Sequence, residues 1–301
     1  MRIGVDLGGT KIEVAALGPD GAFLLRDRHT SPAGDYAKTV RAIREAVAAA
    51  ETKLARKGTV GIGIPGAISP ATGVVKNANS TWLNGHPLDR DLAEALARPI
   101  RVANDANCFA LSEATDGAGK GKRVVFGVIL GTGVGGGVVI DGKSLTGPNA
   151  VAGEWGHNPL PWPEPDELSG PACYCGKSGC IETWLSGPRL SAAFERVSGS
   201  KLDCPDIADR AVKGDATAET LLVTYERRLA KALAHVVNLI DPDVIVFGGG
   251  LSNLDRLYKN VQPQIAEHAF SDAVTTPIVK NHWGDSSGVR GAAWLWPESG
   301  A

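Results

Sequence analysis

Short apolar runs alternate with longer stretches of helical periodicity along the first hundred residues. The segments "RIGVDLG" and "KIEVAAL" are β-rich and joined by a glycine turn, and "TVGIGIPG" and "PIRVANDAN" are two further predicted strands. Between them a helix is predicted from Asp35, its N-cap, to Gly58. Its apolar positions recur at helical spacing: Tyr36, Val40, Ile43, Val47 and Leu54. A second helix, "CFALSEATDGA", is predicted to leave the polar end of "PIRVANDAN".

The plan of the N-terminal segment is repeated later in the chain. "VILGTGVGGGVVIDGKSL" (128–145) follows the same order as "VDLGGTKIEVAALGPDGAF" (5–23): apolar strand, Gly/Thr turn, second strand, Asp-Gly hairpin. A long helix is predicted over 219–240, and Pro242 separates it from the buried strand in "DPDVIVFGGG". Two copies of one α/β plan indicate two similar lobes facing a cleft.

Composition and charge exclude several kinds of partner. The 301 residues are 43% hydrophobic and 21% charged, and the formal net charge of -2 disfavours nucleic acid and anionic membranes as partners. No signal peptide is expected, because Asp6 comes before any apolar segment. The longest uncharged run, 124–140, contains six glycines and fits two strands better than a membrane helix. The cytoplasm is therefore the expected location.

The stretch "GVVIDGKS" (137–144) matches the P-loop pattern, but its context does not. A P-loop needs its first glycine after a strand and its Lys-Ser at the start of a helix. Here Val138 to Asp141 finish a strand, and Gly147 and Pro148 break any helix after Ser144. Lys143 is therefore predicted to be an exposed hairpin residue.

Three other glycine clusters predict nucleotide binding. "DLGGTK" (6–11) and "GTGVGGG" (131–137) are tight turns at matching places in the two repeats, where backbone N–H groups and hydroxyls can approach phosphate oxygens. "FGGGLSN" (247–253) follows a strand and offers bare backbone to a base or ribose. Each cluster taken alone is also typical of a structural turn.

The pattern of cysteines predicts a metal site. "CYCGKSGC" places Cys173, Cys175 and Cys180 close enough to bind one ion, and His157, across a proline-rich loop, is the candidate fourth ligand. Four protein ligands leave no open position, so the zinc is predicted to be structural. The alternative is three unligated buried cysteines.

Asp105 in "VANDANC" is the candidate catalytic base. It follows a strand beside Asn104, where a carboxylate can be held partly desolvated. The alternative is a structural Asx turn or helix N-cap, both common for Asn-Asp pairs. The residues alone leave both interpretations open.

The series "DLGGTK", "NDAN", "GTGVGGG", "GEWGH", "CYCGKSGCIE" and "FGGG" resembles the ROK family (repressors, open reading frames, kinases) over nearly the whole chain. The resemblance implies an α/β fold, the two-lobed actin-like ATPase (ribonuclease H-like) fold with a central cleft that binds Mg-ATP and a hexose. It implies a small lobe of 1–115 plus 285–301, with the first phosphate turn and the catalytic aspartate. The large lobe, 116–284, is expected to hold the second phosphate turn, the zinc site and the adenosine region.

The same resemblance assigns roles to individual residues. Asp105 is implied as the catalytic base, and Asp6 as the organiser of Mg²⁺ through water. His157 is implied to bind both zinc and sugar. Glu154 and Glu182 are implied to hydrogen-bond sugar hydroxyls, although Glu154 could be a surface acid and Glu182 a residue at the start of a helix. The implied sugar ligands are Gly66, Asn104, Asp105, Glu154, His157 and Glu182. The implied nucleotide-binding residues are Gly4, Val5, Asp6, Leu7, Gly8, Gly9, Thr10, Lys11, Gly131, Thr132, Gly133, Val134, Gly135, Gly136, Gly137, Val138, Val139, Ile140, Gly248, Gly249 and Gly250.

Within that family, "GIPGAISPATGVVKNANSTWLNG" and "AGEWGHNPLPW" resemble bacterial fructokinases, also called mannofructokinases. The resemblance predicts ATP-dependent phosphorylation of D-fructose to fructose 6-phosphate, with mannose as a weaker substrate, and a homodimer. A glucokinase or mannokinase of the same family is the alternative. A non-catalytic, sugar-sensing protein of the repressor type is the alternative of another class, disfavoured because the first turn begins at Leu7 and leaves no room for a preceding DNA-binding module.

Overall fold

The computed structural model describes residues 1–297 and contains two five-stranded sheets of the same plan. Their strand orders are β3-β2-β1-β4-β7 and β10-β9-β8-β11-β12. In the first sheet β1 pairs antiparallel with β2 and parallel with β4, and β4 pairs parallel with β7. In the second, β11 pairs parallel with both β8 and β12. The repeat predicted from the two glycine turns is therefore present as two sheets.

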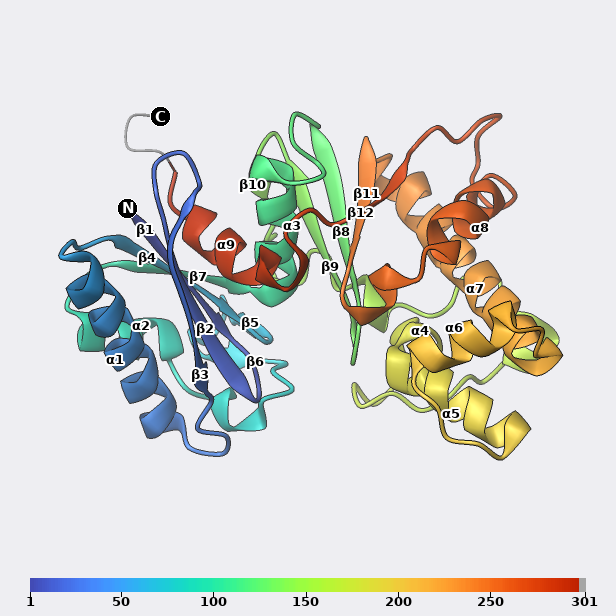
Figure 1. The fold of residues 1–301 in the computed structure, drawn as a ribbon, viewed down its shortest axis with the longest axis horizontal. Coiled ribbons are helices and arrows are strands. Elements are labelled where there is room, and N and C mark those ends of the chain that lie inside the picture. The colour runs from blue at the N-terminus through green and yellow to red at the C-terminus, as the bar shows by residue number, and fades with distance from the viewer. Residues whose placement is uncertain (298–301) are drawn as a thin grey trace. The chain divides into compact units, whose positions relative to one another are not determined.

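The bounds of the elements follow the apolar runs of the sequence (Figure 1). The strands are β1 Arg2–Leu7, β2 Lys11–Leu17, β3 Phe23–Thr30, β4 Thr59–Ile64, β5 Ala67–Ile68, β6 Val75–Lys76, β7 Ile100–Asn104, β8 Val124–Leu130, β9 Val134–Ile140, β10 Lys143–Ser144, β11 Val244–Gly248 and β12 Ile278–Lys280. The α-helices are α1 Tyr36–Leu54, α2 Leu88–Leu96, α3 Asp105–Asp116, α4 Glu182–Leu185, α5 Gly187–Ser198, α6 Cys204–Val212, α7 Ala216–Ile240, α8 Arg256–Ile265 and α9 Ser287–Trp294. Short 3-10 helices are η1 Thr81–Leu83, η2 Trp155–His157, η3 Pro165–Glu167, η4 Gly250–Asn253 and η5 Gly284–Ser286.

The chain forms two compact units, and their limits differ from the predicted lobes. Unit 1 comprises 1–121, 137–153 and the C-terminal segment from Asp285, and unit 2 comprises 122–136 and 154–284. The prediction placed 137–153 in the large lobe. The structure assigns this segment to unit 1 because Gly137 lies against α3, where an added Cβ would be 2.5 Å from the carbonyl oxygen of Ala106.

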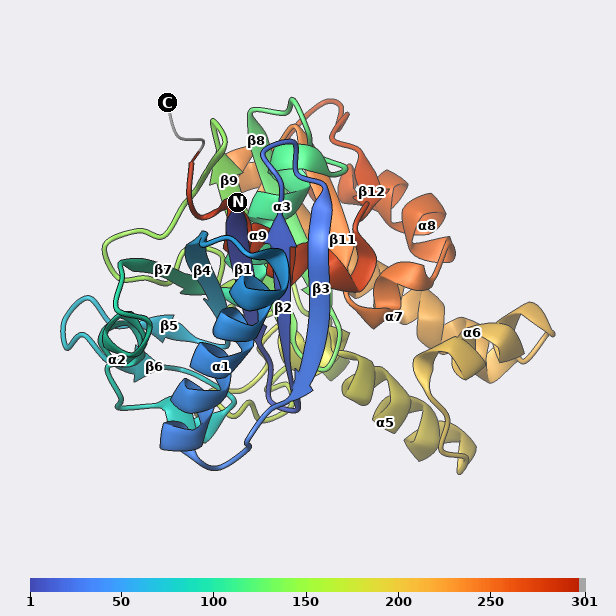
Figure 2. The same cartoon turned by 60° about the vertical axis from the view of Figure 1, so that its left-hand side comes forward.

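Unit 1 is a sheet covered on both faces. Helices α1 and α2 lie on one face and α3 and α9 on the other (Figures 1 and 2). Ile3 and Val5 of β1 belong to the same buried cluster as Ile43 and Val47 of α1. On the other face α9 approaches the strands closely, since a Cβ at Gly4 would lie 1.9 Å from the carbonyl oxygen of Val289. Contact at this distance requires glycine.

The ends of the described chain are joined within unit 1. Arg2 Nε donates to the carbonyl oxygen of Trp296 over 3.2 Å, and Trp296 Nε1 donates to Val60 O over 2.7 Å. The Arg2 guanidinium also lies 4.6 Å from the ring centroid of Trp294. Strand β1 and the end of α9 are therefore held together.

Unit 2 is organised around the long helix α7. The helix packs against α4, α5, α6 and α8 (Figure 1). Its Leu222, Leu229 and Leu233 are fully buried. Asp215 caps it, accepting from the backbone N–H groups of Thr217 and Ala218. In the described residues no helix combines the length and apolar character needed to span a bilayer.

Two local predictions about turns and caps are confirmed. Asp35 is the N-cap of α1 and accepts from Lys38 N, although the helix ends at Leu54, four residues before Gly58, because Ala55 adopts a left-handed conformation. Asp141 and Gly142, with φ of 50° and 72°, form the turn of the β9-β10 hairpin. Lys143 is exposed on that hairpin and starts no helix, so the segment is not a P-loop.

Candidate active site and metal cluster

The first glycine turn, between β1 and β2, presents backbone to the surface of unit 1. Gly8 N–H donates to Lys11 O over 2.9 Å, which closes the turn and leaves Gly9 and Thr10 exposed. The buried hydroxyl of Ser80 lies beside it, 3.4 Å from where a Cβ at Gly9 would stand. Because Gly8 and Gly9 carry no side chains, a phosphate could approach the backbone of this turn closely.

Asp6 stands at the end of β1, immediately before this turn. The register places Asp6 beside Gly63 of β4 and Gly63 beside Ala103 of β7, so the carboxyl ends of three parallel strands lie side by side. A Cβ at Gly288, in the first turn of α9, would lie 3.1 Å from Asp6 Oδ2. Asp6 is thus packed between the sheet and a helix.

The electrostatics of Asp6 indicate a second carboxylate close by. Burial, then the charge of Asp105 and that of Glu13, raise the pKa of Asp6 to about 7. The thiol of Cys108, fully buried beside the two aspartates, has its pKa raised by burial first and then by Asp6 and Asp105. Two carboxylates near one turn are a suitable arrangement for holding a hydrated cation and for accepting a proton.

Asn104 and Asp105 are fixed where β7 passes into α3. Asn104 is the N-cap, its Oδ1 accepting from Ala106 N at 2.9 Å and Asn107 N at 3.3 Å, while its Nδ2 donates to Gly66 O at 3.1 Å. Asp105 begins the helix and its Oδ1 accepts from Ala106 N at 2.7 Å. The N-cap interpretation therefore applies to Asn104, and Asp105 lies in the first turn, where the helix dipole favours the ionised carboxylate.

Gly66, a predicted sugar contact, is the residue whose carbonyl oxygen accepts from Asn104 Nδ2. Its φ is 73°, and an added Cβ would lie 2.3 Å from Lys76 O. The position requires glycine on both counts. Gly66, Asn104 and Asp105 are thus brought together in unit 1 with Asp6 and the first turn.

The second glycine turn, in unit 2, is bound to Glu182. Gly131 N–H donates to Gly133 O over 3.0 Å, and Val134 N–H donates to Glu182 Oε2 over 2.9 Å. A Cβ at Gly133 would meet the same carboxylate oxygen at 2.6 Å. Glu182 is 48 residues from Val134 in sequence, and nothing in the local pattern predicted this hydrogen bond.

Other predicted residues of unit 2 gather around this turn. Trp155 Nε1 donates to Gly135 O over 2.9 Å, which brings the segment from Glu154 to His157 beside the start of β9. At the end of β11, Gly249 has φ of 78°, and a Cβ there would lie 2.4 Å from Leu130 O. The third glycine cluster therefore adjoins the residue that precedes the second turn.

The nucleotide-binding segment predicted after the turn is a strand. Val134 to Ile140 form β9, so only Gly131, Thr132 and Gly133 make the turn itself. The residues from Gly137 onward belong to unit 1. Their backbone groups follow a strand and do not form a concave turn, which leaves the turn as the part suited to phosphate.

The predicted metal ligands form one cluster in unit 2. One potential ligand atom from each of His157, Cys173, Cys175 and Cys180 lies within 4.8 Å of all the others. His157 Nδ1 is 3.6 Å from Cys173 Sγ, and Cys175 Sγ is 3.6 Å from Cys180 Sγ. Zinc bound tetrahedrally at ~2.3 Å from sulfur needs sulfur atoms about 3.8 Å apart. The donor set and its spacing fit that ion.

Tyr174, between the first two cysteines, was missed by the sequence analysis. Its hydroxyl lies 2.9 Å from Nε2 of His157, the ring nitrogen expected to reach a sugar hydroxyl. The Tyr174 side chain is 69% exposed, so it can move away without disturbing a packed core.

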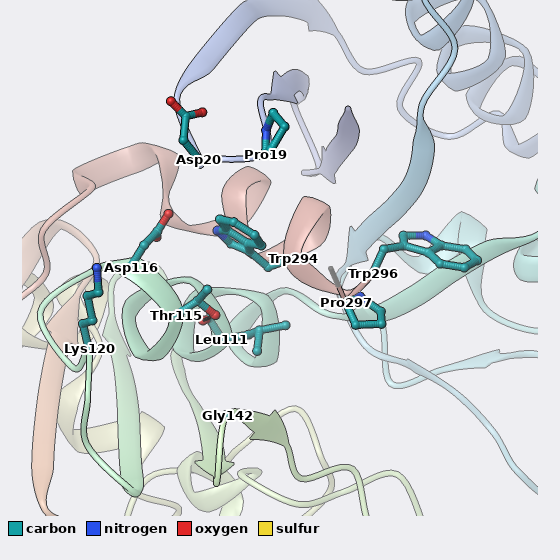
Figure 3. Close-up of a pocket in the computed structure, with 10 residues that line it drawn as sticks. All are labelled: Pro19, Asp20, Leu111, Thr115, Asp116, Lys120, Gly142, Trp294, Trp296 and Pro297. Carbon is teal, nitrogen blue, oxygen red and sulfur yellow. Dashed lines mark hydrogen bonds between the residues drawn. The ribbon is translucent and has the colours of Figure 1, made fainter. Parts of the chain in front are cut away.

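One cavity lies apart from all these residues. It has a volume of about 380 Å³ within unit 1 and is bordered by two tryptophans, Trp294 and Trp296 (Figure 3). Its other lining residues are Pro19, Asp20, Leu111, Thr115, Asp116, Lys120, Gly142 and Pro297. None of the predicted site residues borders this cavity.

Residues 2–299 match the model of the ROK family. The chain belongs to the ROK family. It is similar to an N-acetyl-D-glucosamine kinase of Vibrio cholerae, with 41% identity over 98% of this chain and 99% of that protein. A protein of the same name from Photobacterium profundum is 40% identical over 98% and 99% of the two chains.

Solved structures of the ROK family share the fold. A ROK hexokinase from Thermus thermophilus superposes with a TM-score of 0.86 at 31% identity, covering 97% of this chain and 96% of that chain. A ROK glucokinase from Streptomyces griseus, solved with glucose and AMPPNP, gives a TM-score of 0.79 at 29% identity and covers 98% of each chain. The predicted fold class, the two-lobed actin-like ATPase fold, is confirmed.

Proposed function

We propose that the protein transfers the γ-phosphoryl group of ATP to a hydroxyl of a hexose. The observation that supports this most directly is the grouping of Asp6 and Asp105 at the ends of parallel strands beside a bare glycine turn. Membership of the ROK family and the likeness to a glucokinase solved with glucose and AMPPNP support it as well. A protein that only senses sugar has no need for a base beside a phosphate turn.

In the proposed mechanism Asp105 accepts the proton of the attacking sugar hydroxyl. The hydrogen bond from Ala106 N–H to its Oδ1 orients the carboxylate at the start of α3. Phosphoryl transfer depends mainly on positioning and on stabilising the charge of the phosphate oxygens. Backbone N–H groups of the two glycine turns, other than those of Gly8 and Gly131 that close the turns, are proposed to do this. Asp6 would hold water bound to Mg²⁺, and the ion would neutralise phosphate charge.

The residues proposed to contact the sugar through polar groups are Gly66, Asn104, Asp105, Glu154, His157 and Glu182. Glu182 already accepts from Val134 N, so its second carboxylate oxygen is the one proposed for the sugar. His157 contributes through Nε2 once the Tyr174 hydroxyl has moved aside.

A structural zinc ion is proposed for the cluster of His157 and the three cysteines. Three thiolates and one imidazole nitrogen complete a tetrahedral shell, so the ion supplies loop closure and not a reactive site. It would tie the ends of the loop between His157 and Cys173 to the segment that leads into Glu182.

The identity of the sugar is a finer proposal. D-fructose was predicted from two stretches of sequence, but the relatives named above are N-acetyl-D-glucosamine kinases and do not support that assignment. N-acetyl-D-glucosamine is therefore the first candidate substrate. D-glucose is the second candidate because of the likeness to a glucokinase, and D-fructose is retained only as the third because of "NANSTWLNG" and "GEWGHNPLPW".

A panel of sugars tests both the proposed kinase activity and the proposed identity of the sugar. ADP formation is measured with Mg-ATP and each of N-acetyl-D-glucosamine, D-fructose, D-glucose, D-mannose and N-acetyl-D-mannosamine, with Asp105→Asn as the inactive control. A difference of one well-placed hydrogen bond, ~1.4 kcal/mol, separates kcat/KM values by about tenfold. Highest kcat/KM for fructose would overturn the first candidate and leave the kinase proposal intact. No turnover with any sugar would overturn both.

A further inference from the structure

Three polar side chains on one face of α7 hold the segments that carry the metal ligands and Glu182. Tyr225, Arg228 and Lys231 are spaced three residues apart, which places them on the same side of the helix. We call them the anchor row. Neither Arg228 nor Lys231 was singled out by the sequence analysis, and none of the three belongs to the proposed site.

Lys231 holds the loop between the first two metal ligands. This loop, 158–172, connects His157 to Cys173. The Lys231 side chain is only 3% exposed, and its Nζ donates to Trp162 O and to Glu164 Oε1, both at 2.7 Å. A buried ammonium group is costly unless it is paired and hydrogen-bonded. The loop must therefore keep these two acceptors in place.

Arg228 joins the same loop to α4. Its Nε donates over 2.8 Å to Glu167 Oε1, and the Glu167 side chain has no exposed surface. Glu167 also closes the capping box of η3 together with Glu164. On the α4 side, the guanidinium lies 4.3 Å from the ring centroid of Trp184. One side chain thus contacts both the loop and the helix that begins at Glu182.

Tyr225 holds the end of α4 and makes no contact with the loop among the hydrogen bonds of the described residues. Its hydroxyl donates to the carbonyl oxygen of Leu185 over 2.9 Å, and the residue is 2% exposed. Leu185 is the last residue of the four-residue helix that starts at Glu182. This hydrogen bond fastens the end of the helix that begins at Glu182 to α7.

The loop does not adopt its shape from local preference. Trp162 and Ser169 have φ of 47° and 70°, in the left-handed region that non-glycine residues rarely adopt. Such conformations persist only where the surroundings impose them. The contacts of Lys231 and Arg228 lie next to these positions and supply that constraint.

We propose that the anchor row is a positioning device that fixes both the metal cluster and Glu182, so that it controls sugar affinity without touching sugar. The part concerning sugar rests on the proposed function, whereas the part concerning metal does not. Residues behind metal ligands typically change metal affinity or activity by about 10- to 100-fold when replaced. An effect of that size is expected at the metal cluster.

Lys231→Met is the first test, because methionine keeps much of the apolar stem and removes the ammonium group. Zinc release from the purified holoprotein is followed with the chelating dye 4-(2-pyridylazo)resorcinol. We expect release to be about tenfold faster than in the parent protein. KM for the sugar is expected to rise several-fold, with KM for ATP within about twofold. Lys259→Met, on the exposed side of α8, is the matched control and should change neither quantity.

Tyr225→Phe separates the two roles and removes a single oxygen atom. It should raise KM for the sugar through Glu182 while leaving zinc release as in the parent, because its hydrogen bond goes to α4 and not to the loop. This variant retains the aromatic ring in the core, so it keeps the proposal testable if Lys231→Met does not fold.

The outcomes are distinct. Unchanged zinc release and unchanged KM for sugar in folded Lys231→Met would overturn the proposal, as would equal effects of Lys231→Met and Lys259→Met. A uniform loss of kcat with both KM values unchanged would also contradict positioning of the sugar ligand. If the parent protein turns over no sugar, the proposed function fails, and zinc release alone decides whether Lys231 positions the cluster.

Discussion

Replacing Asp6 by asparagine should stabilise the protein at neutral and alkaline pH while removing its activity. Burial and the neighbouring charges of Asp105 and Glu13 raise the pKa of Asp6 from 3.8 to about 7. Ionising this group therefore costs the folded chain free energy that the unfolded chain does not lose. Asparagine has nearly the same shape and no charge, so the Asp6→Asn variant avoids the cost.

The size and sign of the effect follow from the two pKa values. Below pH 3.8 Asp6 is protonated in both states and the substitution should change the free energy of unfolding little. Between pH 3.8 and 7 the unfolded chain releases the proton and the folded chain retains it, so the parent protein loses stability as pH rises. Above pH 7 the loss is complete. A difference of about three pKa units at ~1.4 kcal/mol each sets an upper limit of about 4 kcal/mol.

The assay is urea unfolding of parent and variant at pH 5, 6, 7 and 8, without nucleotide or magnesium, followed by tryptophan fluorescence and circular dichroism. The stability difference should grow with pH up to about 7 and then level off. Asp272→Asn, at an exposed position in unit 2, is the control for the change of net charge. A difference that stays constant from pH 5 to 8, or falls, would refute the reasoning. In addition, Asp105→Asn should lower the pKa of Asp6, measured by carboxyl NMR, because it removes the nearest like charge.

Four other outcomes are expected. Asp105→Ala should lower kcat by at least ~100-fold in folded protein, and near-parental turnover would remove it from the mechanism. Lys143→Ala, on the exposed hairpin, should leave kcat and both KM values unchanged. Gly133→Val should raise KM for ATP by about tenfold or more, since a side chain there collides with Glu182. The opposite result for the two variants would favour a P-loop. Elemental analysis should give about one zinc per chain, and Cys175→Ser should lower both metal content and Tm; a metal-free protein of equal stability would contradict the closed site. Light scattering after size exclusion should give the mass of a homodimer, and a monomer at micromolar concentration would argue against it.

The local parts of the fold and site were predictable because short-range chemistry determines them. Asp35 begins α1 since its side chain accepts from Lys38 N, and Asp141-Gly142 makes a hairpin because both residues tolerate positive φ. The short spacing of Cys173, Cys175 and Cys180 likewise predicts that their three sulfur atoms lie close together. Each of these predictions depends on residues fewer than ten positions apart.

The parts that the sequence did not reveal depend on contacts between distant segments. Glu182 was expected near a sugar, but its hydrogen bond to Val134 N joins segments 48 residues apart. Lys231 and Glu164 are 67 residues apart, and a lysine in a helix ordinarily indicates a solvated face. The assignment of 137–153 to unit 1 depends on the packing of Gly137 against α3, which no local pattern encodes.

The contact between Arg2 and Trp296, near the two ends of the described residues, has a practical consequence for protein engineering. Because Arg2 Nε donates to the carbonyl oxygen of Trp296, a short peptide linker attached at Pro297 is enough to connect residue 297 with residue 1. The natural break can then be moved elsewhere, for example into the β9-β10 hairpin at Gly142, or abolished by backbone cyclisation. A cyclic chain has fewer unfolded conformations, so it should withstand heating and exopeptidases better while leaving both glycine turns and the cysteine cluster untouched.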